Sequence, residues 1–145
     1  MSISAYKSVG LHSDINSASP HRLIQMLYEG AISSINQAIG AIDRKRYDEK
    51  SSLISKSIAI LVELEASLNA DRGGEIADNL AKLYSYMRES LLYASGANDT
   101  DKLSEVSSIL MELKEAWDEV PVELRYTSGG RVTPEVPKES EDEEL

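Results

Sequence analysis

The sequence predicts an all-α protein that forms an antiparallel, up-down-up-down four-helix bundle. The clearest observation is a ladder of apolar residues three and four positions apart, which makes one apolar stripe on a helix: Leu103, Val106, Leu110, Leu113 and Trp117. Three earlier segments of the chain repeat this spacing. The turns between the four segments are about three to six residues long, and such short turns favour antiparallel neighbours over crossover connections.

The first helix is predicted over about 20–44. Ser19 and Pro20 mark its start, because a Ser hydroxyl caps free amide groups and Pro at the first helical position loses no hydrogen bond. Its inward-facing stripe is Ile24, Leu27, Tyr28, Ala31, Ile35, Ala38, Ile39 and Ile42.

The second helix is predicted over about 48–70. Asp48 and Glu49 lie at its start, where the helix dipole favours negative charge. Its stripe is Ile54, Ile58, Leu61, Leu64 and Leu68.

The third and fourth helices are predicted over about 75–95 and about 100–119. A turn at 71–74 with two glycines precedes the third helix. Its stripe is Ile76, Leu80, Leu83, Tyr84, Met87, Leu91 and Ala94. Asp99 or Thr100 can cap the fourth helix, which ends before a proline.

The bundle therefore occupies 19–120, and the two ends of the chain are expected to be flexible. Residues 1–18 form an arm that is rich in Ser and has apolar residues at no helical period. Residues 121–145 form an acidic tail with three of the four prolines. Such a tail buries too little apolar surface to offset the entropy lost on ordering.

Composition and charge indicate where the protein is located and which classes of partner are excluded. The chain of 145 residues suits one domain, and without cysteine it has neither disulfides nor thiolate metal ligands. Its opening lacks the pattern of a secretory signal, so we expect it in the cytosol. A net charge of -10 and the lack of an apolar run of roughly twenty residues argue against nucleic acid partners and direct membrane insertion.

The sequence contains no catalytic, cofactor or metal site that we can identify. A di-iron bundle needs Glu-x-x-His pairs, and this chain has none. A phosphotransfer bundle exposes a histidine midway along a helix, whereas His21 falls in the first turn of the first helix. We therefore expect a surface or capping role for His21, and a phosphotransfer domain stays only as an alternative.

Apolar residues outside the inward stripes favour a binding protein. They are Ile60, Val62, Tyr86, Leu92, Ile109 and Met111. Some of them widen the core, and the others are expected to form an exposed groove of the kind that marks a partner site. The chain also has seven tyrosines and no phenylalanine, and tyrosine suits surfaces that are alternately wet and covered.

Several short segments together resemble the FliS family of flagellin-specific export chaperones. The likeness covers about residues 5–118. The segments are Ala5-Tyr6, Ala18-Ser19-Pro20 with Leu23, Met26-Leu27-Tyr28-Glu29-Gly30, Glu63-Leu64, Leu68-Asn69, Gly73-Gly74-Glu75-Ile76-Ala77, Asn79-Leu80, Leu83-Tyr84-Ser85-Tyr86-Met87, and Leu103-Ser104-Glu105-Val106 through Ala116-Trp117. The resemblance implies that the bundle binds the disordered C-terminal segment of flagellin, prevents premature polymerisation and docks at the export-gate protein FlhA.

The off-stripe residues and the resemblance together give a set of candidate site residues. We expect the flagellin contacts at Leu11, Ile60, Tyr86, Ile109 and Met111. The resemblance further implies that the N-terminal arm caps the empty groove, with Ile3 and Tyr6 as cap and gate-docking residues. The alternative is a generic helical adaptor that self-associates through its apolar stripes, and the sequence leaves a homodimer open.

Overall fold

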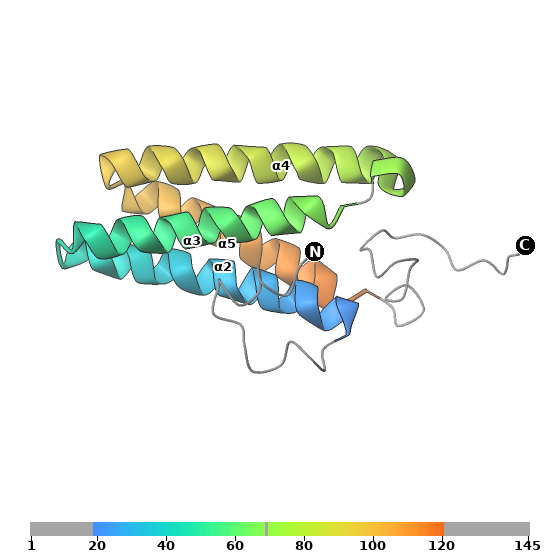
Figure 1. Cartoon of the computed structure of the whole chain (residues 1–145), viewed down its shortest axis with the longest axis horizontal. Helices are drawn as coiled ribbons and strands as arrows, with labels where there is room; N and C mark the ends of the chain where they lie inside the picture. The colour runs from blue at the N-terminus through green and yellow to red at the C-terminus, as the bar shows by residue number, and fades with distance from the viewer. Residues whose placement is uncertain (1–18, 69, 121–145) are drawn as a thin grey trace, which may run out of the picture.

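The structure, a computed structural model, describes residues 19–68 and 70–120, and within its third helix the side chains from residue 74 onward. The described residues form four α-helices: α2 (Pro20–Asp43), α3 (Tyr47–Ala66), α4 (Ala70–Ala97) and α5 (Thr100–Asp118) (Figure 1). The prediction of an all-α four-helix bundle is confirmed. The expected arm at 1–18 and tail at 121–145 lie outside the described residues.

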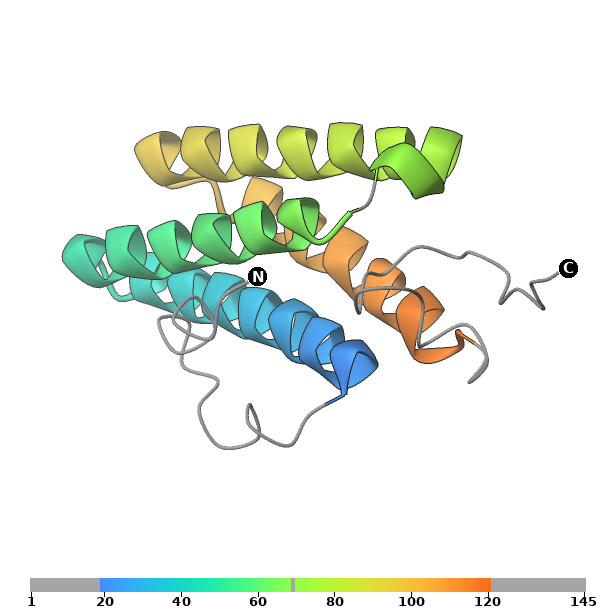
Figure 2. The same ribbon diagram turned by 45° about the vertical axis from the view of Figure 1, so that its right-hand side comes forward.

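The helices pack in a ring in which α2 contacts α3 and α5, and α4 contacts the same two helices from the other side. Figures 1 and 2 show that successive helices run in opposite directions. Contacts between helix ends agree with this arrangement. Lys50 at the start of α3 donates to the carbonyl of Ser95 near the end of α4, at 2.6 Å. Each helix is therefore antiparallel to the neighbours that follow and precede it.

Helix capping follows the sequence signals. Ser19 Oγ accepts a hydrogen bond from the Arg22 amide at 3.1 Å, at the start of α2. Asp99 Oδ1 accepts one from the Lys102 amide at 3.0 Å, at the start of α5. Of the two caps considered for the fourth helix, Asp99 is the one used.

The junction between α3 and α4 differs from the prediction. Helix α3 ends at Ala66 rather than near residue 70, and α4 begins at Ala70 rather than near residue 75. Gly74 interrupts α4 with φ 55° and ψ -130°, a conformation open to glycine because it has no Cβ. Gly74 therefore breaks the helix, but residues 70–73, which include most of the predicted turn, are helical.

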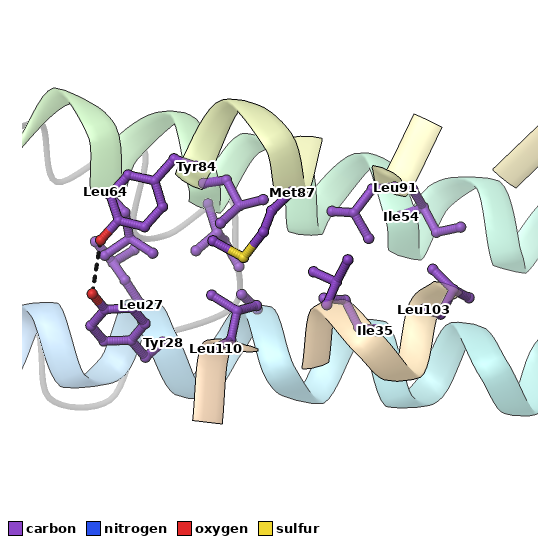
Figure 3. Close-up of a cluster of buried hydrophobic side chains, with 14 of the residues drawn as sticks. Leu27, Tyr28, Ile35, Ile54, Leu64, Tyr84, Met87, Leu91, Leu103 and Leu110 are labelled. Atoms are coloured by element: carbon purple, nitrogen blue, oxygen red, sulfur yellow. Dashed lines mark hydrogen bonds between the residues drawn. The ribbon is translucent and has the colours of Figure 1, made fainter. Parts of the chain in front are cut away.

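Most residues of the four predicted stripes meet in one core (Figure 3). Ile76 is an exception, because it was expected in the third stripe but is 55% exposed. The fully buried side chains of the core include Leu27, Ile35, Ile54, Leu61, Leu64, Met87, Leu91, Leu103 and Leu110. A polar pair crosses this core, where the hydroxyls of Tyr28 and Tyr84 lie 2.8 Å apart. Burial raises the pKa of both hydroxyls, so each remains protonated and able to hydrogen-bond.

The position of Ile60 differs from the prediction. This residue was expected outside the inward stripe, as a flagellin contact, but it is 0% exposed within the core. The reason is that α3 packs against both α2 and α4, so a wide arc of the helix is covered. Ile60 is therefore a core residue and is not available as a surface contact.

Candidate functional site

Exposed large apolar side chains mark where the bundle can bind a partner. Most of them lie on α4 and α5: Ile76, Tyr86, Leu92, Tyr93 and Met111. Tyr47 and Val62 are the exposed members on α3. Exposed apolar surface on such a bundle marks interaction sites, and the candidate binding surface comprises Tyr86, Tyr93 and Met111, which line grooves beside α5. Leu92 is not part of this surface, because it lies one helical turn after Arg88, which pairs with Glu65 of α3.

A groove between α4 and the start of α5 contains two of these tyrosines, and we call it the tyrosine groove. Its lining is Tyr86, Glu89, Ser90, Tyr93, Asp99 and Lys102. The Tyr86 hydroxyl donates to Glu105 Oε2 at 2.7 Å, and Lys102 Nζ donates to Glu105 Oε1 at 3.0 Å. Lys102 Nζ also lies 5.9 Å from the centre of the Tyr86 ring. These contacts hold the Tyr86 ring in place while 42% of the side chain stays exposed.

Electrostatics in this groove follow from the same contacts. The hydrogen bond from Tyr86, and next the one from Lys102, lower the pKa of the Glu105 carboxyl. The hydrogen bond to Glu105 in turn raises the pKa of Lys102. Both groups therefore stay charged around neutral pH and continue to orient Tyr86.

A second groove, between α2 and α5, has a different character, and we call it the methionine groove. It is lined by Glu29, Ile32, Ser33, Asn36, Gln37, Met111 and Lys114. The Ser107 hydroxyl donates to Asn36 Oδ1 at 3.1 Å, which links the two helices beside the groove. Met111 is 50% exposed, so the groove offers a polarizable apolar contact among amide and hydroxyl groups.

The expected contact residues within the described part of the chain lie on two different sides of the bundle. Tyr86 lies in the tyrosine groove, and Ile109 lies on the α4 side of α5 because it is one helical turn after Glu105. Ile109 is partly buried against the core. Met111 lines the methionine groove on the α2 side of α5. Tyr86 and Ile109 therefore lie on one side of α5, and Met111 lies on the other.

Other expected site residues lie outside the described part, and one exposed residue was missed. Leu11, Ile3 and Tyr6 fall within the undescribed residues 1–18. Tyr93 is 60% exposed in the tyrosine groove, although it was not among the predicted contact residues. Its spacing of seven residues from Tyr86, which places both on one face of a helix, was the available signal.

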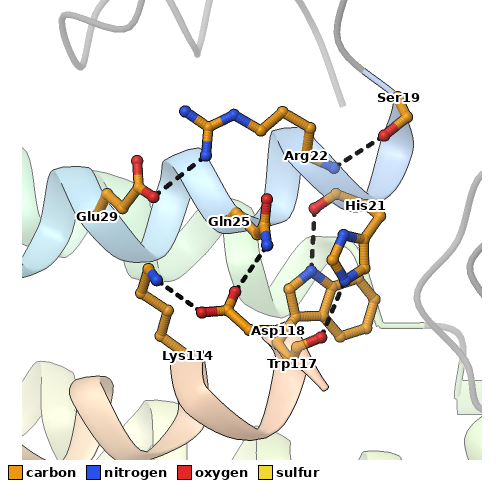
Figure 4. Close-up of polar contacts among 8 residues, drawn as sticks. All are labelled: Ser19, His21, Arg22, Gln25, Glu29, Lys114, Trp117 and Asp118. Carbon is orange, nitrogen blue, oxygen red and sulfur yellow. Dashed lines mark hydrogen bonds and ion pairs between the residues drawn. The ribbon is translucent and has the colours of Figure 1, made fainter. Parts of the chain in front are cut away.

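His21 also departs from its expected role. It is buried at the start of α2 and stacks on Trp117 at the end of α5, with ring centres 4.7 Å apart (Figure 4). His21 Nε2 lies 2.9 Å from the Trp117 carbonyl, and Trp117 Nε1 donates to the His21 carbonyl at 3.0 Å. We call this pair the His–Trp clasp. The expectation of a surface role is wrong, because His21 is buried. Ser19 caps α2, whereas His21 contacts a carbonyl in the last turn of α5 and so ties two distant parts of the chain together.

Polar contacts beside the clasp strengthen the same junction. Gln25 Nε2 donates to Asp118 Oδ1 at 2.7 Å, and Lys114 Nζ donates to Asp118 Oδ2 at 2.7 Å. The Lys114 hydrogen bond lowers the pKa of the Asp118 carboxyl, with a smaller contribution from Gln25. The clasp and Asp118 thus fix the end of α5 against α2.

Two other kinds of feature, a metal site and a membrane-spanning helix, are not found among the described residues. Within 19–68 and 70–120, no group of three or more His, Cys, Asp or Glu side chains is placed to hold a metal ion. Over the same residues, no helix is long and apolar enough to cross a membrane.

Comparisons with known proteins agree on one family. A family model described as "Flagellar protein FliS" matches residues 2–123. The flagellar secretion chaperone FliSB of Pseudomonas aeruginosa is 44% identical over 113 residues, which are 78% of this chain and 90% of the relative. The flagellar secretion chaperone FliS of Vibrio cholerae is 35% identical over 131 residues, 90% and 96% of the two chains. That of Salmonella typhimurium is 40% identical over 119 residues, 81% and 88%.

Proposed function

Because the chain belongs to the FliS family of flagellar secretion chaperones, which are not enzymes, we propose that it binds the disordered C-terminal segment of flagellin. It acts in the cytosol, prevents that segment from polymerising prematurely and delivers flagellin to the flagellar export gate. The terminal segments of flagellin are the parts that polymerise, so covering one of them keeps the subunit competent for export.

The observation that carries this proposal is the exposed apolar surface on both sides of α5. Tyr86 and Ile109 contribute on the α4 side and Met111 on the α2 side. A disordered segment that crosses α5 can bury apolar side chains in both grooves. Part of the favourable free energy is lost in ordering that segment, so binding stays reversible and needs no nucleotide.

The N-terminal arm has a proposed role as well. The arm at 1–18 covers the empty binding surface and moves aside when flagellin arrives. In this scheme Leu11 contacts flagellin, and Ile3 and Tyr6 serve as the cap and as part of the surface that docks at the gate protein FlhA.

Calorimetric titration tests the proposal. The purified full-length protein is titrated with the C-terminal segment of the flagellin from the same cell, and circular dichroism is recorded on the mixture. We expect one-to-one binding and more helix in the mixture than in the two components, because the client segment folds as it binds. A well-folded protein that self-associates and gives no heat with flagellin would instead support the helical adaptor and a homodimer.

A further inference from the structure

The tyrosine groove holds two aromatic side chains at a defined spacing. Tyr86 and Tyr93 are seven residues apart on α4, which corresponds to about 10.5 Å along a helix axis. They are 42% and 60% exposed, so each offers apolar surface to a partner. Ser90 lies between them and is buried, so the two tyrosine rings are more accessible to a partner than the residue between them.

This spacing matches a helical partner better than an extended one. On a helix laid along α4, residues one heptad apart lie on the same face with the same separation of about 10.5 Å. An extended segment advances about 3.3 Å per residue and alternates its faces, so side chains on one face fall about 6.6 or 13 Å apart. Neither of these distances matches the tyrosine pair.

The charged residues of the groove indicate that the partner has a positively charged side chain. Glu89 and Asp99 line it and Glu105 adjoins it, while its one lining cation, Lys102, is paired with Glu105. Asp99 is used as the cap of α5, and Glu89 makes no ion pair with any described residue. In a chain of net charge -10, this arrangement favours a cationic group over Glu89.

We propose that the tyrosine groove binds an amphipathic helix with two apolar side chains one heptad apart, over Tyr86 and Tyr93, and a Lys or Arg that pairs with Glu89. The inference rests on the proposed function, since this helix is the part of the client that folds on binding. It adds a sequence requirement for the client: the basic residue lies between the two apolar residues, on the same face.

A pair of synthetic peptides tests the charge requirement. The first has leucines one heptad apart on an otherwise soluble helical sequence, with a Lys between them, and the second has Glu in place of that Lys. We expect the full-length protein to bind the Lys peptide about fivefold to tenfold more tightly, as befits one exposed ion pair exchanged for a repulsion. The charge-reversal variant Glu89→Lys should invert the preference.

A pair of neighbouring substitutions tests the position of the helix. Tyr93→Ser removes one ring of the groove, and we expect it to weaken binding of the Lys peptide about tenfold. Leu92→Ser is the matched control, because Leu92 is 63% exposed but lies one turn after Arg88, which pairs with Glu65 of α3. That control should change binding less than twofold, and thermal melting by circular dichroism should give the same midpoint for both variants and the wild type.

The outcomes separate this inference from the proposed function. Equal binding of the Lys and Glu peptides, or equal loss with Tyr93→Ser and Leu92→Ser, would overturn the inference even where the flagellin segment binds. If the peptides fail to bind and Tyr93→Ser instead abolishes self-association of the protein, the groove is an interface between two copies and the inference is wrong. A preference for the Lys peptide without binding of flagellin would support the inference and contradict the proposed client.

Discussion

The His–Trp clasp and the tyrosine groove use aromatic side chains in opposite ways. In the clasp, the Trp117 ring stacks on His21 and its indole N–H is satisfied by a carbonyl of α2. In the groove, Tyr86 has its hydroxyl satisfied by Glu105, while much of the side chain stays open to solvent. Where both the apolar face and the polar edge find partners within the chain, the aromatic residue stabilises the fold. Where the hydroxyl is paired but much of the ring stays exposed, as at Tyr86, the exposed surface remains for another molecule.

Among the substitutions considered, one in the His–Trp clasp should have the largest effect on stability. Trp117→Ala removes the stacked ring and the hydrogen bond to the His21 carbonyl, so we expect a loss of roughly 2–4 kcal/mol in the free energy of unfolding. Urea denaturation followed by circular dichroism measures it. A change below about 0.5 kcal/mol, the size usual for surface substitutions, would mean that the clasp does not stabilise the bundle.

The buried tyrosine pair gives the next effect. Tyr84→Phe leaves the Tyr28 hydroxyl in the core without its partner, at a cost of about 1–3 kcal/mol in the free energy of unfolding. Denaturation of the double variant Tyr28→Phe/Tyr84→Phe is the control. We expect it to recover part of the loss, because no buried hydroxyl then lacks a partner. A double variant as unstable as the sum of the two single variants would contradict this account.

His21→Gln should have a smaller effect, of about 1 kcal/mol on the free energy of unfolding. Glutamine can still donate to the Trp117 carbonyl but cannot stack on the indole as imidazole does. The same variant addresses the phosphotransfer alternative, since that activity would require a labelled His21. We expect motility to be retained by cells that carry the variant, and its loss despite normal thermal melting would reopen that alternative.

The groove side should show the smallest effect on stability, with a defined dependence on pH. Tyr86→Phe removes the hydrogen bond that lowers the pKa of Glu105. A carboxyl with a lowered folded-state pKa stabilises the fold above its unfolded-state pKa, and the benefit disappears as the pH falls through the folded-state pKa. Any stability advantage of the wild type over Tyr86→Phe should therefore be present at neutral pH and vanish in acid. An advantage that grows in acid would contradict this assignment.

Local periodicity was sufficient to predict the fold and most helix starts. The apolar ladders identified four helices, and Ser19 and Asp99 provide caps that depend only on the nearest turn of the chain. Positions that depend on distant neighbours were harder. Ile60 is buried because two other helices flank α3, and His21 is buried because Trp117, 96 residues away, covers it. Neither burial can be predicted from the spacing of apolar residues within a single helix.

The candidate site was only partly predictable for the same reason. The sequence pointed to Tyr86, Ile109 and Met111 as residues outside the stripes, but the side of α5 on which each lies depends on how α2 and α4 pack around it. Tyr93 was not predicted as a contact residue. Its spacing of seven residues from Tyr86 is visible in the sequence, but the exposure of that face of α4 depends on how the other helices pack.

We propose that flagellin contacts the face of α4 on which Tyr86 and Tyr93 are exposed, and site-specific photo-crosslinking tests this proposal. A photoreactive phenylalanine analogue is placed at position 93 or at position 92, and each full-length protein is illuminated with the C-terminal segment of flagellin. We expect a crosslinked product from position 93 and little from position 92. Equal crosslinking from both positions, or crosslinking from position 92 alone, would contradict it.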